Sequence, residues 1–192
     1  MKRLLKIILL FSICSINQIY AQRAKGEFIK IVIGLGLSAP DKKFEKDINF
    51  TGTGFYASGE YVVGLSSWFA LRPYASFIFT DAATNNQQNP FNYKITNKAL
   101  MIGGKVRILA PIPYFAPYFE VGVGLSAGSF QTYTPYANID KNGVVPHIPF
   151  TFGVALGKNN KVDVAFVYYF HSSVEQFSGG LAFGYTFPLG KK

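Results

Sequence analysis

Large apolar and small residues alternate along the last part of this chain with a period of two. Between residues 180 and 187 the large side chains are Leu181, Phe183, Tyr185 and Phe187, with Gly, Ala or Thr on either side of each. Successive side chains of a β-strand point to opposite faces, so the pattern predicts a strand with one apolar face and one narrow face. The same period recurs along most of the chain, which predicts an all-β fold.

Eight strands are predicted from this pattern. They span residues 26–38, 52–63, 68–80, 94–109, 114–130, 147–157, 161–171 and 177–187. Tight connections at 64–67, 110–113 and 158–160 alternate with longer ones near 39–51, 81–93 and 131–146 and a shorter one at 172–176. An even strand number with alternating short turns and long loops is typical of an antiparallel up-and-down barrel.

The two faces of the predicted strands differ in chemistry. One face is apolar and includes Ile29, Ile31, Ile33, Leu35, Leu37, Phe77, Phe79, Leu100, Ile102, Phe119, Val121, Val123, Phe152 and Phe166. The other is small or polar and includes Gly34, Gly36, Ser58, Gly122, Gly124, Ser126, Thr151 and Gly153. A water-soluble barrel would hide the apolar face and expose one rich in Gly, Ala and Ser with few charges, which is unusual. We therefore expect the apolar face to contact lipid.

Composition and strand length agree with a membrane barrel. Charged residues make up 15% of the chain and aromatic residues 17%, whereas a soluble domain has about 25% charged residues. The predicted strands also match a lipid crossing, which takes about 9–11 tilted residues. The chain is basic, with a net charge of +9. Its Lys and Arg are scattered, which favours attraction to anionic lipid headgroups over nucleic-acid binding.

The N-terminus has the pattern of a secretory signal. Lys2, Arg3 and Lys6 precede a short apolar segment, and Ala21 offers a small residue for cleavage. We expect residues 1–21 to be a cleaved signal peptide and residues 22–192 to form the barrel domain. Cleavage would remove Cys14, the only cysteine, so no disulfide or thiolate chemistry is expected.

Three segments carry a resemblance to a known family: Ser67–Pro73, Tyr118–Gly124 and Gly180–Phe187. With the signal and the strand number, they resemble the small outer-membrane β-barrels of Gram-negative bacteria, of the OmpX and OmpA transmembrane-domain type, grouped with outer membrane protein β-barrel domain and porin-family sequences. The resemblance covers about residues 23–188. It implies an eight-stranded antiparallel up-and-down transmembrane β-barrel, multi-pass in the bacterial outer membrane. Eight strands with short periplasmic turns place both termini in the periplasm.

Charged residues on the narrow face are the candidate site. They are Lys30, Glu60, Arg72, Lys105, Arg107, Glu120 and Asp163. A hairpin centred on Ser66 would pair Glu60 with Arg72, and one centred between residues 112 and 113 would pair Lys105 with Glu120. Buried charges persist only when paired, and eight strands enclose just enough room for side chains. We expect a salt-bridged, side-chain-plugged lumen. The alternative is a charged constriction that passes small solutes.

One short segment raises the question of catalysis. Some eight-stranded outer-membrane enzymes that remove acyl chains from lipopolysaccharide use a His-x-Ser pair with a Glu, and His171, Ser173 and Glu175 contain these residue types. Strand parity places His171 on the lumen side, away from lipid. We therefore predict no enzyme and no catalytic site. With His147 and His171 as the only histidines, we predict no metal or cofactor site.

The loops at residues 41–47, 85–92 and 132–136 are the remaining place for interactions. The expected role is structural or interactive: a monomeric barrel that stabilises the membrane surface or adheres through these loops. Its expected partners are outer-membrane lipid and lipopolysaccharide, and an extracellular ligand of the loops. The alternatives are a narrow porin-like conduit for small or hydrophobic solutes and, less favoured, a lipopolysaccharide acyl-chain hydrolase.

Overall fold

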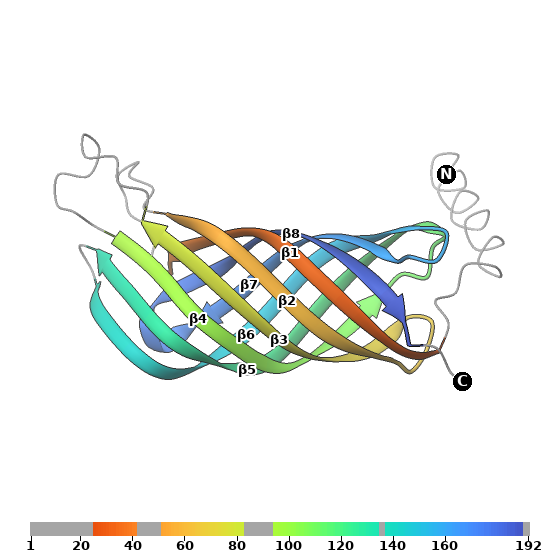
Figure 1. Ribbon diagram of the computed structural model, residues 1–192, viewed down its shortest axis with the longest axis horizontal. Helices are drawn as coiled ribbons and strands as arrows, with labels where there is room; N and C mark the ends of the chain where they lie inside the picture. Colours follow the sequence, from red (N-terminus) through yellow and green to blue (C-terminus); the bar gives the residue numbers. More distant parts are fainter. Residues whose placement is uncertain (1–24, 42–50, 83–93, 135–136, 190–192) are drawn as a thin grey trace, which may run out of the picture.

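The chain folds into a closed antiparallel β-barrel, which confirms the predicted fold class (Figure 1). The computed structural model describes residues 25–41, 51–82, 94–134 and 137–189. The strands are β1 (Gly26–Pro40), β2 (Gly52–Gly64), β3 (Phe69–Ala82), β4 (Lys94–Leu109), β5 (Tyr114–Thr134), β6 (Ala137–Gly157), β7 (Val162–His171) and β8 (Gln176–Pro188). Each strand pairs with its chain neighbours, and β8 closes the barrel against β1. In this part of the chain, no helix is long and apolar enough to cross a membrane.

Three tight turns define one end of the barrel, called the turn end here. Between β2 and β3 the amides of Leu65 and Ser66 donate to the carbonyl of Phe69 at 3.2 and 3.1 Å. Between β4 and β5 the amide of Ala110 donates to the carbonyl of Pro117 at 2.9 Å. Lys25 and Leu189, the described ends of the chain, lie at this same end (Figure 1). The opposite end, where β3, β5 and β7 finish, is called the loop end. The predicted signal peptide, residues 1–21, and the loop residues 42–50 and 83–93 lie outside the described residues.

Side-chain exposure follows the predicted parity. On β1, Ile31, Ile33 and Leu35 are exposed by 53%, 56% and 66%, while Lys30 and Val32 are buried. The exposed apolar side chains continue around every strand of the barrel and form an outward apolar surface. Aromatic residues border this surface at the turn end, among them Tyr61, Trp68, Tyr114, Phe115 and Phe187. An apolar band flanked by aromatic residues is the exterior expected of a barrel in lipid.

The strands β5 and β6 are longer than expected. Each has 21 residues, and they remain paired from Tyr114 opposite Gly157 to Thr134 opposite Ala137. The long loop predicted at residues 131–146 is therefore wrong, because most of that segment is β-hairpin. Beyond Ser129 its outward residues are polar apart from Tyr133, and most side chains between 138 and 144 of β6, which we call the tip region, are exposed. A strand outside lipid needs no apolar face, so the alternation that marks membrane strands ends before the strand does.

Candidate functional site

The barrel interior near the turn end holds all seven charged residues predicted to face inward. Glu120 is their centre: its Oε1 accepts from Arg107 Nε at 2.6 Å and Arg72 Nη1 at 3.1 Å, and its Oε2 lies 2.8 Å from Lys105 Nζ. Glu60 contacts Lys105 Nζ at 2.8 Å and Arg72 Nη2 at 2.9 Å. All of these side chains are almost fully buried. We call this set, with Lys30 and Asp163, the interior ion cluster.

Asp163 extends the interior ion cluster across the barrel. Arg107 Nη1 donates to Asp163 Oδ1 at 2.8 Å, and Lys30 Nζ lies 3.5 Å from the other carboxylate oxygen. The Arg107 guanidinium also stacks over the ring of Tyr118, with Cζ 3.5 Å from the ring centre. Such stacking adds to the attraction of a cation for its surroundings when water is excluded. Charges from β1 to β7 are thus joined into one network that occupies the barrel cross-section.

The hairpin registers expected from the sequence are wrong by two residues. Glu60 lies opposite Tyr74 rather than Arg72, and Glu120 lies opposite Arg107 while Lys105 lies opposite Gly122. In both hairpins the turn closes one residue further along the chain than expected. An even shift keeps each side chain on its predicted face. The long Arg72 and Lys105 side chains then span the offset and still reach Glu60 and Glu120.

Hydroxyl and aromatic side chains fill the next level toward the loop end. The hydroxyls of Tyr56 and Tyr169 lie 2.8 Å apart, and Ser76 Oγ lies 3.2 Å from the Tyr169 hydroxyl and 2.9 Å from Ser58 Oγ. The rings of Tyr74 and Tyr169 contact one another at 6.2 Å between centres. Tyr56, Tyr74, Tyr118 and Tyr169 are all buried.

A chain of four side chains runs through this level. Tyr74 Oη lies 2.5 Å from His147 Nε2, His147 Nδ1 lies 2.7 Å from Ser126 Oγ, and Ser126 Oγ lies 2.8 Å from His171 Nε2. Because a hydroxyl carries one proton, Ser126 donates to one imidazole and must accept from the other. The hydrogen bonds among these four side chains therefore all run in the same direction, and both imidazole rings can be neutral.

This row of hydrogen-bonded side chains was not predicted from the sequence, although Ser126 and His171 were placed on the inward face. Its members come from β3, β5, β6 and β7. Which inward residues of distant strands meet depends on the stagger of the whole barrel, and no local pattern reports it.

At the loop end the interior is closed by polar contacts and by a short 3₁₀ helix, η2 (Ser172–Val174). Val174 is fully buried, and its carbonyl accepts from Thr132 Oγ1 at 2.8 Å. Asn97 Nδ2 donates to Ser178 Oγ at 2.5 Å, and the hydroxyls of Ser38 and Thr80 are hydrogen-bonded. The lumen is thus occupied by side chains at three successive levels.

Two inward glycines make room for this filling. A Cβ at Gly124 would overlap His147 Nε2 and lie 2.6 Å from the Tyr74 hydroxyl. A Cβ at Gly153 would lie 2.7 Å from the Tyr118 hydroxyl. Packing therefore explains why this face of the strands carries glycine: large rings from other strands lie across Gly124 and Gly153.

The residues considered for catalysis do not form a triad. His171 is fully buried and is hydrogen-bonded to Ser126, whereas Ser172 and Ser173 are exposed. Glu175 adopts a left-handed backbone conformation, and its carbonyl accepts from the Asp41 amide at 3.0 Å. The only hydroxyl hydrogen-bonded to His171 within the described residues therefore points into the lumen and away from lipid. Over the same residues, no three His, Cys, Asp or Glu side chains gather as a metal site would require.

Comparisons with known proteins identify the fold. No family model matches the chain, and no curated protein matches it. Solved structures do: Neisserial surface protein A, NspA, has a TM-score of 0.57 at 11% identity and covers 86% of this chain and 98% of its own. The attachment invasion locus protein Ail of Yersinia pestis has a TM-score of 0.49 at 17% identity, covering 85% of this chain and 100% of its own. OprG of Pseudomonas aeruginosa has 0.49 at 12%, covering 87% and 99%. The likeness to NspA shows that this chain shares its fold.

Proposed function

We propose that the protein is an integral protein of the bacterial outer membrane whose barrel is closed to solutes and whose role is structural or interactive at the membrane surface. The outward apolar surface with its aromatic border supports placement in lipid. Every strand of the barrel has two neighbours, so no edge within the lipid needs a second subunit. A monomer with both termini in the periplasm is the arrangement we propose.

The observation that carries this proposal is the filled lumen. The interior ion cluster, the Tyr and Ser side chains, and the contacts around η2 occupy successive levels of the barrel. A conduit needs a continuous polar path whose groups are free to contact the passing solute. Here the carboxylates of Glu60 and Glu120 are already bound to cations of the wall. Interactions outside the barrel therefore account for the protein better than transport does.

The β5–β6 hairpin is the described element best placed for such interactions. Its tip residues Asp140, Lys141 and Asn142 are exposed and lie beyond the apolar surface. The hairpin continues two barrel strands without a break, so the tip is held at a fixed position relative to the membrane. A rigid support is what lets an exposed loop bind with little loss of conformational entropy. Lys141 and its neighbours could contact phosphate groups of lipopolysaccharide or an extracellular ligand.

Complementation of a strain lacking the protein separates the two roles. The measurements are uptake of a hydrophobic fluorescent dye, which reports membrane integrity, and attachment of the cells to a surface. The first variant combines Asp140→Ala, Lys141→Ala and Asn142→Ala at the hairpin tip. The matched control combines Lys158→Ala and Asn159→Ala at the turn end, where both side chains are also exposed.

We expect the control to behave as the wild type in both measurements. A surface-interaction role predicts that the tip variant restores dye exclusion but not attachment. A purely structural role predicts that the tip variant restores both. If the strain without the protein excluded dye and attached as well as the wild type did, both roles would be wrong.

A further inference from the structure

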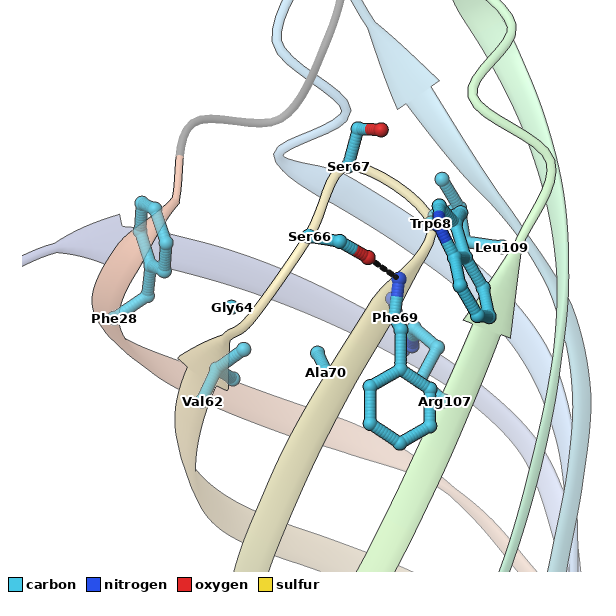
Figure 2. A pocket seen from close by; sticks show the side chains of 10 residues that line it. All are labelled: Phe28, Val62, Gly64, Ser66, Ser67, Trp68, Phe69, Ala70, Arg107 and Leu109. Carbon is cyan, nitrogen blue, oxygen red and sulfur yellow. Dashed lines mark hydrogen bonds between the residues drawn. The ribbon is translucent and has the colours of Figure 1, made fainter.

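A groove crosses the outward apolar surface from β1 to β4. Its volume is about 310 Å³, and its outward lining includes Ile31, Ile33, Ala57, Gly59, Phe77 and Leu100. The pocket under the β2–β3 turn is far smaller (Figure 2). It holds about 10 Å³, close to the space that one water molecule requires. The groove on the outer surface is therefore the larger of the two hollows by more than an order of magnitude and has room for part of a chain-like molecule.

Small residues on two neighbouring strands form the floor of the groove. Gly59 of β2 lies between Ile31 of β1 and Ala75 of β3. Ala57, the next outward residue of β2, lies opposite Phe77. A Cβ at Gly59 would meet no atom within 4 Å, so the space above it is open. The outward surface is otherwise rich in large side chains, and this local change of size produces the hollow.

The position of the groove limits what fills it. It lies within the apolar surface that we place in lipid, and its outward lining is apolar. Water has no hydrogen-bond partner on such a lining, whereas a flexible hydrocarbon chain can contact the floor and both sides at once. Dispersion contacts of this kind are individually small and add up along the chain. An acyl chain therefore fits the groove better than a polar solute does.

A cation lies next to the groove on its loop-end side. Leu100 lines the groove, and the next outward residue of β4 toward the loop end is Lys98. Lys98 Nζ lies 4.6 Å from the centre of the Phe79 ring and 3.6 Å from a carboxylate oxygen of Asp81. The Lys98 side chain is nevertheless 43% exposed, and an exposed ion pair of this kind is weak. Because an ammonium group has three donors, Lys98 can also bind a phosphate oxygen.

We propose that this outer face binds one molecule of lipid A, the lipid part of lipopolysaccharide, with an acyl chain in the groove and a phosphate at Lys98. The inference rests on the proposed function, because it takes the loop end to lie in the outer leaflet. It adds a defined lipid site on β1–β4, separate from the tip of the β5–β6 hairpin. The charge beside an apolar groove matches a lipid that carries its phosphates at one end and its acyl chains at the other.

Gly59→Leu tests the groove without a clash inside the protein, because its new side chain enters the open space. Gly104→Leu is the matched control: a Cβ there also meets no atom within 4 Å, and Gly104 is outward but does not line the groove. Lys98→Gln tests the phosphate. The measurement is native mass spectrometry of the barrel released from detergent micelles, after titration with lipid A or with phosphatidylethanolamine, whose own ammonium group balances its phosphate.

We expect the wild type to retain one lipid A at a lower lipid concentration than it needs for phosphatidylethanolamine. Gly59→Leu should need several times more lipid A for the same occupancy, and Gly104→Leu should match the wild type. Lys98→Gln should lose the preference for lipid A over phosphatidylethanolamine. If Gly59→Leu does not fold, Ala75→Leu fills the same groove from β3 and carries the same expectation.

Equal retention of lipid A by the wild type and the groove-filling variant would overturn the proposal. Equal retention of both lipids by the wild type would do the same. A wild-type dimer that Gly59→Leu converts to a monomer would assign the groove to a second copy of the chain instead. None of these results would touch the closed lumen or the surface role, which conductance and cell attachment test separately.

Discussion

Glu120 is the residue on which the interior depends most, because one carboxylate contacts Arg72, Lys105 and Arg107. Glu120→Ala should destabilise the barrel by about 3–5 kcal/mol, the usual effect of leaving a buried charge without its partner. The measurement is the free energy of unfolding from a reversible denaturant titration. Double-mutant cycles with Lys105→Ala and Arg107→Ala should each give a clear coupling energy. Purely additive effects in both cycles would mean that these contacts contribute nothing.

Gly124 and Gly104 form a matched pair for the packing of the lumen. Gly124→Ala should cost about 1–3 kcal/mol, because the new methyl group overlaps His147 and the Tyr74 hydroxyl. Gly104→Ala adds the same group at a position with no atom within 4 Å and should have little effect. Equal free energies of unfolding for the two variants would contradict the close packing around Gly124.

At the residue scale, strand parity was enough to predict which charged residues face inward and form the interior ion cluster. Their individual contacts were not predictable. A contact such as Arg107 to Asp163 joins β4 to β7, which are far apart in the sequence. Their distance depends on barrel closure and on the registers of three intervening strand pairs. The hydrogen bonds that link Tyr74, His147, Ser126 and His171 were not predicted for the same reason.

At the element scale, the clearest test of the strand faces is charge on the outer surface. Val123 and Phe152 are exposed by 72% and 65%. Val123→Arg and Phe152→Arg should each cost about 2–4 kcal/mol, the range for an Arg near the midplane of a lipid-embedded barrel. Thr151→Ser, a change on the buried face next to Phe152, should have a small effect. The measurement is refolding into lipid vesicles; harmless Arg at both positions would place these residues outside lipid.

The ends of the barrel make a second prediction at this scale. A membrane-impermeant thiol reagent on intact cells should label Lys141→Cys on the β5–β6 hairpin and should not label Asn159→Cys at the turn end. The physical reason is that the three tight turns lie at one end of the barrel and the extended β5–β6 hairpin lies at the other, and short turns face the periplasm in barrels of this kind. Labelling of position 159 before the membrane is permeabilised would reverse the orientation.

The length of the β5–β6 hairpin shows where sequence patterns stop being informative. The apolar alternation reports the part of each strand that contacts lipid. Residues such as Gln131 and Asp140 continue the strands in water and hydrogen-bond across the hairpin at 3.1 Å, but they carry no alternation. The predicted strands therefore ended near the edge of the apolar surface.

At the scale of the whole molecule, the closed barrel and the burial of its inward side chains belong together. Eight strands give an interior that side chains can fill, and the inward residues are large enough to do so at each level. Glycines such as Gly124 and Gly153 relieve the crowding, and ion pairs satisfy the buried charges. The outer surface is apolar and the inner surface is polar, which is the reverse of a soluble domain.

The most direct test of this account is the single-channel conductance of the purified barrel in a planar lipid bilayer. Insertion is verified first by the resistance of the barrel to added protease. The account predicts little or no current, because side chains block the lumen at several levels. Stable and reproducible current steps from the wild type would contradict the closed lumen and favour the conduit. Loss of those steps on neutralising Arg72 or Lys105 would then place the selective constriction in the interior ion cluster.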